Sequence, residues 1–427
     1  MAQRPFAASL SLLPGHASPL VLPRNPSALP PNPVALSLSK RSFTQLALTA
    51  GATALLPNAH ALPARTLSFP RDHGAHPDHR TEWWYITGYG SDGQRDVGFQ
   101  VTFFRSRVEA TQGMQSKFAA KQLLFAHAAV TDVQGKKLLH DQRIARAGFG
   151  IAQASELDTQ VKLRDWTLAR NAATGSYQAN IKARDFSINL QFAPVQPLLL
   201  QGKNGLSRKG PEEKQASYYY SQPQLQASGS ITLGGQRISI GSKPATTPAQ
   251  PSAIPAPPLP AGAPAQPTPI AKPSSAAWLD HEWSDELLHP EAIGWDWIGM
   301  NLFDGSALTA FQLRKKDGRA LWTGGSFRAT SSSGLQTFIA QPGEVQFQAI
   351  KGWTSPLTGA KYPIQWLVRT PADYYTVKAV IPNQELDSRS STGAVYWEGL
   401  SDLFDSNDKH VGRGYLEMTG YTGALKI

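Results

Sequence analysis

The sequence predicts an all-β protein made of two tandem antiparallel β-barrels. Short runs alternate between apolar and polar residues, as in residues 97–103, 230–233 and 345–347, and Val, Phe, Thr and Tyr are prominent in them. Such alternation is typical of strands with one buried face. Hairpin-type dipeptides separate the runs: Asp92-Gly93, Gly234-Gly235, Asp304-Gly305 and Asp317-Gly318. Helical periodicity is hard to find, so many short strands at this spacing favour a barrel or a sandwich.

Residues 1–61 are expected to be a targeting segment and not part of the fold. The pair Lys40-Arg41 precedes an apolar stretch at 46–56, and Ala59-His60-Ala61 has the small-x-small pattern of a cleavage site. The apolar stretch is too short for a stable membrane anchor. The order Ser-Lys-Arg-Ser-Phe resembles a twin-arginine export signal with Lys in place of the first Arg. We therefore expect cleavage near Ala61 and a mature protein that is periplasmic or secreted.

A second segment without predicted secondary structure, residues 244–273, interrupts the body of the chain. It contains eleven prolines and almost no charged residues. Because proline cannot donate a backbone hydrogen bond, such a run favours a polyproline-like or disordered linker. The linker divides the mature chain into an N-terminal barrel, 62–243, and a C-terminal barrel, 274–427. Barrels of about eight strands are filled by side chains or hold one small ligand.

The composition excludes several classes of site and partner. The 427 residues contain no Cys, which excludes disulfides, thiol nucleophiles, iron–sulfur clusters and cysteine zinc sites. Lys and Arg number 41 against 31 Asp and Glu, and four of these basic residues lie in the first 61 residues. The remaining excess forms no basic run with interleaved aromatics, so no nucleic-acid partner is expected. No segment approaches the length of a membrane-spanning helix, so no stable membrane span is expected.

The first group of residues that could carry chemistry is the segment 76–85. In a strand, alternate residues lie on opposite faces: Glu82, Trp84 and Ile86 on one, Trp83, Tyr85 and Thr87 on the other. Desolvation beside indoles would raise the pKa of the Glu82 carboxyl and make it a general acid near neutral pH. Alternatively, Glu82 pairs with an arginine at a barrel mouth.

A metal site is the other interpretation of this segment. His76, His79 and Glu82 are all metal-ligand types, but their spacing matches no strong zinc signature. We therefore expect neither a metal nor another cofactor.

The second group lies in the segments 277–284 and 294–297. Here Asp280 and Glu282 project from one face of a strand, and His281 and Trp283 from the other. Asp296 lies between Trp295 and Trp297, whose side chains its strand would point the opposite way. Buried carboxylates are costly unless they are paired or neutral, so carboxylates among indoles favour acid catalysis. The alternative is ion pairing, for which four arginines are available: Arg314, Arg369, Arg389 and Arg413.

General hydrolase, metalloprotease and nucleotide-binding motifs are absent, but several long aromatic motifs resemble one family. They occupy residues 76–88 (HPDHRTEWWYITG), 218–223, 278–284 (WLDHEWS), 294–305, 396–399 (YWEG) and 412–421 (GRGYLEMTGY). They resemble the AttH-like / carotenoid 1,2-hydratase family of lipocalin-like proteins, often labelled predicted secreted hydrolases. At His281 an Arg is the more usual residue in that family. The resemblance covers about residues 66–427 apart from the Pro-rich segment.

The resemblance implies two tandem lipocalin-like barrels and, for some relatives, addition of water across unactivated carbon–carbon double bonds. Hydrating an alkene without a metal needs a carboxylic acid to protonate carbon, aromatic faces to stabilise the cation, and a base for water. We expect Asp280 or Asp296 as the acid, with Glu82 and Glu282 as orienting or base groups. The residues expected to bind a hydrophobic, isoprenoid- or lipid-like substrate are His281, Trp283, Trp295, Trp297, Trp83, Trp84, Tyr85 and His76.

We therefore expect an exported enzyme of hydratase or hydrolase type, and a non-catalytic carrier is the rival hypothesis. Many bacterial members of the family lie beside ABC-transporter genes, so an exported double barrel could bind a hydrophobic ligand and pass it to a transporter. In that case the carboxylates would be structural pairs. The two hypotheses differ in whether the carboxylates line one cavity or pair with arginines.

Overall fold

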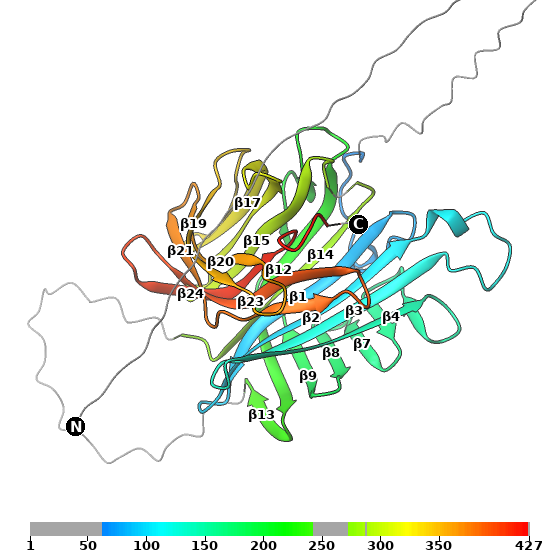
Figure 1. Ribbon diagram of the computed structural model, residues 1–427, viewed down its shortest axis with the longest axis horizontal. Helices are drawn as coiled ribbons and strands as arrows, with labels where there is room; N and C mark the ends of the chain where they lie inside the picture. The colour runs from blue at the N-terminus through cyan, green and yellow to red at the C-terminus, as the bar shows by residue number, and fades with distance from the viewer. Residues whose placement is uncertain (1–61, 242–271, 287, 426–427) are drawn as a thin grey trace, which may run out of the picture. The chain divides into compact units, whose positions relative to one another are not determined.

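A computed structural model of the chain describes residues 62–241, 272–286 and 288–425. The predicted targeting segment and nearly all of the Pro-rich segment 244–273 lie outside these residues. The described chain is almost entirely β-structure, with two short 3-10 helices, η1 (Arg71–His73) and η2 (Glu109–Thr111) (Figure 1). In this part of the chain no helix has the length and apolar character needed to cross a membrane.

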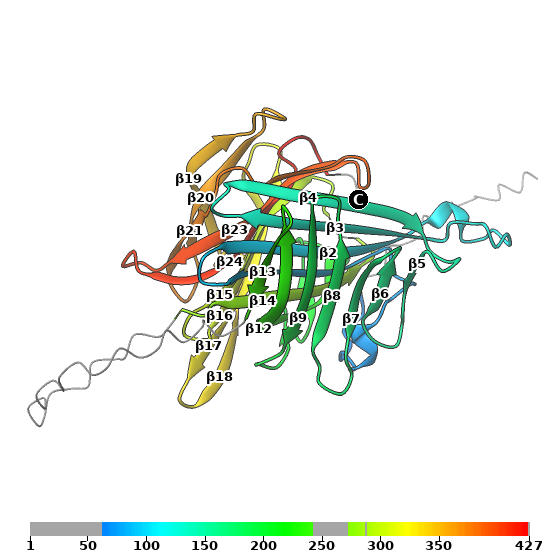
Figure 2. The same ribbon diagram turned by 90° about the horizontal axis from the view of Figure 1, so that it is seen from below.

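The first sheet is antiparallel and runs in the order β4-β3-β2-β1-β14-β12-β9-β8-β7-β6-β5, with β10, β11 and β13 paired to β12 (Figure 2). Its strands are β1 (Thr81–Ser91), β2 (Asp96–Arg107), β3 (Gln122–Asp132), β4 (Lys137–Arg146), β5 (Ala152–Ala154), β6 (Gln160–Leu163), β7 (Trp166–Arg170), β8 (Tyr177–Lys182), β9 (Phe186–Ala193), β10 (Leu199–Leu200), β11 (Leu206–Arg208), β12 (Ala216–Leu233), β13 (Gln236–Ile240) and β14 (Ser275–Ser284).

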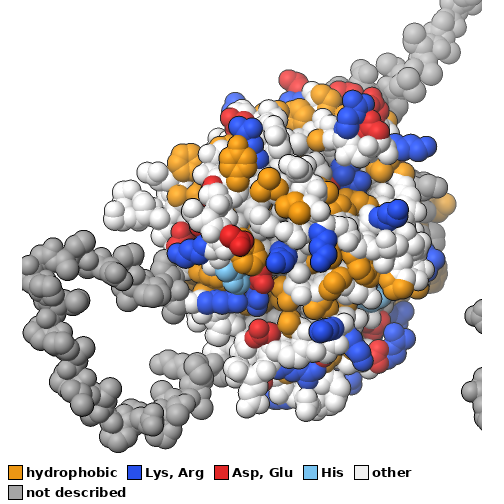
Figure 3. All heavy atoms as spheres, turned by 60° about the vertical axis from the view of Figure 1, so that its left-hand side comes forward, with side chains coloured by type: hydrophobic (Ala, Val, Ile, Leu, Met, Phe, Trp, Pro, Cys, Tyr) orange, Lys and Arg blue, Asp and Glu red, His pale blue; other side chains and the backbone are white. Residues whose placement is uncertain are grey.

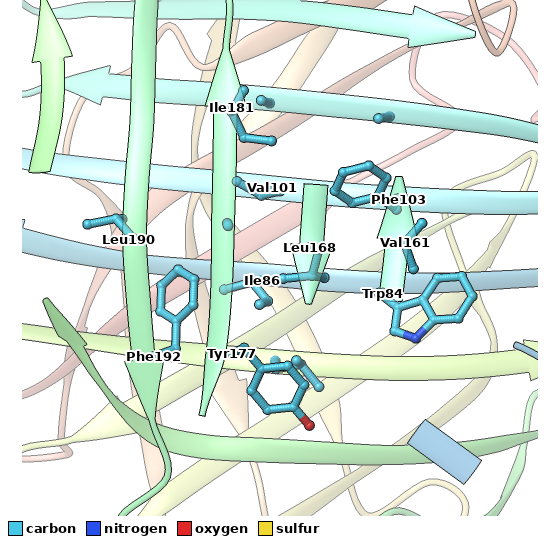
Figure 4. Packing of buried hydrophobic residues seen from close by; sticks show 14 of the residues in the cluster. Trp84, Ile86, Val101, Phe103, Val161, Leu168, Tyr177, Ile181, Leu190 and Phe192 are labelled. Carbon is cyan, nitrogen blue, oxygen red and sulfur yellow. The ribbon is translucent and has the colours of Figure 1, made fainter. Parts of the chain in front are cut away.

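This sheet curls into a nearly closed barrel around one hydrophobic core. Trp84 and Ile86 of β1 face the side chains of the opposite wall, among them Leu168 of β7, Tyr177 of β8 and Phe192 of β9 (Figure 4). All five side chains are essentially buried. Removing this apolar surface from water stabilises the curled sheet by about 25 cal/mol for each Å² buried.

The second sheet is also antiparallel and runs in the order β18-β17-β16-β15-β24-β23-β21-β20-β19, with β22 paired to β23. Its strands are β15 (Ala292–Leu302), β16 (Ala307–Lys315), β17 (Ala320–Ser331), β18 (Gly334–Ile339), β19 (Gln346–Thr354), β20 (Lys361–Arg369), β21 (Tyr374–Ala379), β22 (Glu385–Ser388), β23 (Ala394–Phe404) and β24 (His410–Met418). A separate hydrophobic core, which includes Ile298, Trp366 and Trp397, fills its concave side. The predicted all-β fold of two antiparallel units is confirmed.

The hairpin dipeptides connect neighbouring strands as the sequence predicts. Asp92-Gly93 joins β1 to β2, and Asp317-Gly318 joins β16 to β17. Gly93 has a φ of 93° and Gly318 a φ of 84°, a conformation that glycine adopts without steric cost.

The boundary between the sheets does not coincide with the Pro-rich segment. That segment precedes β14, and β14 pairs with both β1 and β12 of the first sheet. The change from the first sheet to the second falls between Ser284 and Ala292, not at residue 274. The alternation of β14 fits either sheet, so the sequence pattern alone could not assign the strand.

The two sheets contact each other across β1 and β14 on one side and β15 and β24 on the other. Tyr85 and Trp278 from the first sheet and Trp297 and Tyr415 from the second belong to one hydrophobic cluster. The outer faces of β1 and β14 therefore form one wall of the space between the sheets, and their inner faces line the first barrel.

Candidate functional site

Strand alternation sends the predicted site residues into two different compartments. Glu82 and Trp84 of β1, with His281 and Trp283 of β14, point into the first barrel, where both Trp side chains join its core. Their neighbours Trp83, Tyr85, Asp280 and Glu282 line the space between the sheets. The predicted faces of both strands are confirmed, but the two groups do not form one site.

Inside the first barrel, Glu82 is the centre of a buried hydrogen-bond network. Its Oε1 accepts from His76 Nδ1 at 2.7 Å and from His281 Nε2 at 2.9 Å. Its Oε2 accepts from the His76 backbone N–H and from Arg105 Nε, both at 2.8 Å. Although burial alone would raise the pKa of Glu82, hydrogen bonds from His281 and His76 hold it far below its usual value.

The two histidines beside Glu82 have different hydrogen-bond partners. His76 Nε2 lies 3.0 Å from Asp72 Oδ1, so each of its ring nitrogens faces a carboxylate oxygen. His281 Nδ1 lies 3.1 Å from the Tyr220 hydroxyl, and burial lowers the pKa of His281 to about 4. His281 is therefore neutral, donates to Glu82 through Nε2 and accepts from Tyr220.

This network is better suited to holding the barrel than to binding a metal. His76, Glu82 and His281 do offer three ligand atoms within 4.8 Å of one another. However, Arg105 forms an ion pair with Glu82 at 2.8 Å, and a second cation there would be repelled. Both ring nitrogens of His76 already lie within hydrogen-bond distance of carboxylate oxygens, those of Glu82 and Asp72. The alternative in which Glu82 pairs with an arginine is the one the structure contains.

The outer compartment is a cavity of about 320 Å³ between the two sheets. Its wall is mainly apolar and includes the aromatic rings of Trp83, Tyr85, Phe104, Phe125, Tyr219, Trp295, Trp297, Phe311 and Tyr396. Five carboxyl residues line this cavity: Asp280 and Glu282 from β14, Glu398 from β23, Glu417 from β24, and Glu82 from β1, whose carboxylate oxygens are bound in the network inside the barrel. An apolar wall with a few polar groups is typical of a small-molecule site.

Asp280 is fully buried and accepts three hydrogen bonds. The donors are the Tyr219 hydroxyl at 2.7 Å, the Ser221 hydroxyl at 2.6 Å and Trp278 Nε1 at 2.7 Å. Burial outweighs these bonds and raises the pKa of Asp280 to about 7. Trp297 Nε1 donates to the same Tyr219 hydroxyl at 3.3 Å, so Asp280 is connected to the opposite wall of the cavity.

Glu282 is the ion-paired carboxylate of the cavity. Its Oε1 lies 2.9 Å from Lys209 Nζ and accepts a 2.5 Å hydrogen bond from the Ser217 hydroxyl. The Lys209 ammonium also lies 4.6 Å from the ring centre of Tyr219 and 4.5 Å from that of Phe311. Glu282 is thus held as a charged partner of Lys209.

Glu398 and Glu417 are the carboxyl groups that sequence reasoning missed. They are direct partners across β23 and β24. Burial and then the charge of Glu417 raise the pKa of Glu398 well above its usual value. Burial, together with the charges of Asp280 and Glu282, raises the pKa of Glu417 to about 7. In the described part of the chain, Glu398 Oε1 and the Tyr85 hydroxyl form no hydrogen bond of ordinary geometry, but Tyr85 lies close enough to Glu398 to oppose the rise in its pKa.

A signal for these two residues was present in the sequence. Tyr396 and Glu398 are two apart on one strand, as are Tyr415 and Glu417 on the next, the same pattern that drew attention to β1 and β14. Both pairs lie in the motifs that resemble the family's closing segment. His127 also lines the cavity, where burial lowers its pKa to about 3 and its Nδ1 lies 2.6 Å from the Tyr396 hydroxyl.

Asp296 lies outside the cavity, in the core of the second sheet. Its Oδ2 is 2.7 Å from Arg314 Nε and accepts from Gln312, and its Oδ1 accepts from the Tyr421 hydroxyl at 2.9 Å. Burial raises the pKa of Asp296, and the nearby Arg314 charge opposes this shift. The predicted alternative of an arginine partner therefore holds for Asp296. Its neighbours Trp295 and Trp297 point the opposite way, into the cavity.

Comparison with known proteins places this arrangement in a family. No curated protein sequence matches the chain. A crystal structure described as AttH from Nitrosomonas europaea is 42% identical, covers 84% of this chain and 99% of its own, and superposes with a TM-score of 0.71. Kievitone hydratase from Nectria haematococca shares the fold, at 12% identity and a TM-score of 0.60, over 84% of this chain and 94% of its own. A family model described as AttH-like matches residues 60–243 and 269–421, and the chain therefore belongs to the AttH-like family.

Proposed function

We propose that the chain is an exported hydratase-type enzyme that protonates a carbon–carbon double bond of a hydrophobic substrate and adds water to it. The observation that carries this proposal is the gathering of three buried carboxyl groups, Asp280, Glu398 and Glu417, in one apolar cavity, where burial raises their pKa values. Carboxyl groups that keep their protons near neutral pH can act as general acids.

Glu398 is the proton donor in this mechanism. Burial and the charge of Glu417 raise its pKa well above the usual value, and no hydrogen bond to its Oε1 meets ordinary geometric limits in the described structure. The O–H bond of Glu398 breaks as a C–H bond forms on the alkene, which leaves a carbocation. The faces of Trp295 and Trp297 line the same cavity and stabilise the cation by up to about 2 kcal/mol each when water is excluded.

Glu417 is the base. Its pKa of about 7 leaves a substantial ionised fraction at neutral pH, and it lies directly across from Glu398. The oxygen of a water molecule bonds to the carbocation, and Glu417 takes the proton that this water loses. Transfer of that proton to Glu398 restores both groups, so the cycle consumes only the alkene and water.

A carrier is the second candidate, and a specific observation favours it. Asp280 accepts three hydrogen bonds within the protein and Glu282 is paired with Lys209, as structural carboxylates are. A cavity with such walls could hold a hydrophobic ligand unchanged and deliver it to an ABC transporter.

The test compares the wild type with Glu398→Gln in water enriched in oxygen-18, using a hydrophobic extract of the host's cell envelope as the probe. We expect the wild type to form products that have gained one labelled water, and Glu398→Gln to lose at least about 100-fold in rate. Glu213→Gln is the matched control, because Glu213 is exposed and does not line the described cavity. Full activity in Glu398→Gln would contradict the mechanism. An unchanged lipid bound equally by all three proteins would support the carrier.

Export rests on the N-terminal segment and has its own test. Amino-terminal sequencing of the protein recovered from the periplasm or the medium should begin just after Ala61. Recovery of the intact chain only from the cytoplasm would contradict export.

A further inference from the structure

Two loops at one end of the first barrel carry an exposed apolar and basic surface that the cavity chemistry does not use. We define this loop patch as Met114, Lys117 and Phe118 of the β2–β3 loop with Arg146, Phe149 and Ile151 at the β4–β5 connection. Figures 1 and 2 show these connections at the same end of the barrel, on the right in both views. Met114 is 50% exposed, Phe118 65%, Phe149 53% and Ile151 43%.

The aromatic residues of the loop patch are held in place although they face solvent. The rings of Phe118 and Phe149 lie nearly parallel, with centroids 5.6 Å apart. The Arg146 guanidinium lies 4.1 Å from the Phe149 ring centre, and its Nη1 donates to the Phe118 carbonyl at 2.9 Å. The Gln112 side chain donates to the Val108 and Lys121 carbonyls and closes the base of the loop. The patch is therefore presented in one arrangement.

Apart from Glu109, whose carboxylate forms an ion pair with Arg107, the two loops that form the loop patch carry only basic charged side chains. Residues 110–131 and 142–155 contain no Asp or Glu, while Lys117, Lys121 and Arg146 lie in or beside the loop patch. The face shown in Figure 3 differs, since its hydrophobic side chains are interspersed with both basic and acidic ones. Clustered exposed apolar side chains mark interaction sites, and a basic rim selects a negatively charged partner.

We propose that the loop patch docks the protein on the surface of a lipid bilayer that contains anionic phospholipids. The exposed apolar side chains of the loop patch have basic groups at their edges, which suits the boundary between lipid headgroups and acyl chains. There the aromatic rings can enter the bilayer while the basic groups contact phosphate. The position also suits a hydrophobic ligand, because β2 and β3 continue from the patch into the cavity wall at Ser106 and Phe125. This docking is independent of whether the cavity is catalytic.

The experiment measures co-sedimentation of the protein, as recovered from its host, with vesicles of phosphatidylcholine alone or mixed with phosphatidylglycerol. We expect binding to the mixed vesicles that weakens with added salt. Phe118→Ser with Phe149→Ser should reduce it at least about tenfold, because both inserted rings are lost. Lys117→Gln and Lys121→Gln should each reduce it about fivefold.

The matched control is Phe338→Ser with Leu357→Ser, which removes apolar side chains that are 54% and 63% exposed in the second half of the chain. It should bind the vesicles as the wild type does. Equal binding by all variants, or no binding to anionic vesicles, would overturn the proposal. Self-association that only the Phe118 and Phe149 variant loses, without vesicle binding, would assign the patch to a second copy of the chain and overturn it as well.

Discussion

Replacing Asp280 with Asn should remove part of the pH dependence of the protein's stability. Asp280 is fully buried, and burial raises the pKa of its carboxyl to about 7 from its ordinary value of 3.8. Between these two values the folded state holds a proton that the unfolded chain releases. The free energy of unfolding therefore falls as the pH rises through this range and levels off above pH 7.

The size of the effect follows from the shift in pKa. One pKa unit corresponds to about 1.4 kcal/mol, so the shift of Asp280 costs the folded state up to about 4 kcal/mol at alkaline pH. Part of that loss is already present at pH 5, which leaves about 2.5 kcal/mol between pH 5 and pH 8. The amide of the Asp280→Asn variant does not titrate, so the variant should lack this decline. Tyr219 and Ser221 can turn their hydroxyls to accept from the new amide.

The assay is urea unfolding of the wild type and Asp280→Asn at pH 5 and pH 8. The difference in unfolding free energy between the two proteins should shift in favour of the variant by about 2.5 kcal/mol between these pH values. Asp185→Asn is the control, because Asp185 is exposed on the β8–β9 turn, and its difference from wild type should not change with pH. If the difference in unfolding free energy between Asp280→Asn and the wild type is the same at pH 5 and pH 8, within about 0.5 kcal/mol, then burial does not hold the Asp280 carboxyl neutral.

Three further substitutions test the rest of the architecture. Glu82→Gln should lower the free energy of unfolding by about 3–5 kcal/mol in urea titrations near neutral pH, because it leaves Arg105 buried without its carboxylate. The pKa of Glu82 is depressed, so the wild-type protein should lose this contribution only in strong acid. Asp296→Asn should cost about 3 kcal/mol in the same assay and leave cavity binding intact, because its partner is Arg314. Gly414→Ala should cost about 2–3 kcal/mol in thermal unfolding, because its Cβ would overlap a carbonyl oxygen of β15, whereas Gly113→Ala, whose Cβ would meet open space, should be neutral.

Sequence pattern was a good guide to which side chains share a strand face. The alternation in β1 and β14 correctly separated Glu82 and His281 from Tyr85 and Asp280. The turn dipeptides correctly marked the hairpins of both sheets. These features are local, since the two-residue repeat of a strand and the conformational freedom of glycine act within a few residues.

The sequence pattern could not predict which strands far apart in the chain lie beside one another. Glu398 and Glu417 become a pair only because β23 lies beside β24, and they meet Asp280 only because the second sheet packs on β14. Likewise, nothing near Asp296 shows that Arg314 lies across the β15–β16 hairpin at its carboxylate. Family resemblance identified the segments that carry these residues, but the side chains that share a cavity follow from sheet packing.

The shared wall of β1 and β14 explains why neighbouring carboxyl groups have opposite properties. On its inner face, hydrogen bonds from His76, His281 and Arg105 converge on Glu82 and hold its pKa low, so this group stays charged and fastens the barrel. On its outer face, Asp280 and Glu282 share the cavity with Glu398 and Glu417, and Lys209 pairs with Glu282, so burial and mutual repulsion raise the pKa values of Asp280, Glu398 and Glu417. Since His281 lies between Asp280 and Glu282 in one strand, the rigid inner network also fixes the backbone from which the cavity groups project. Asp280 on the cavity side of the wall can therefore keep a raised pKa despite its cost, because the hydrogen-bond network on the other side stabilises the wall.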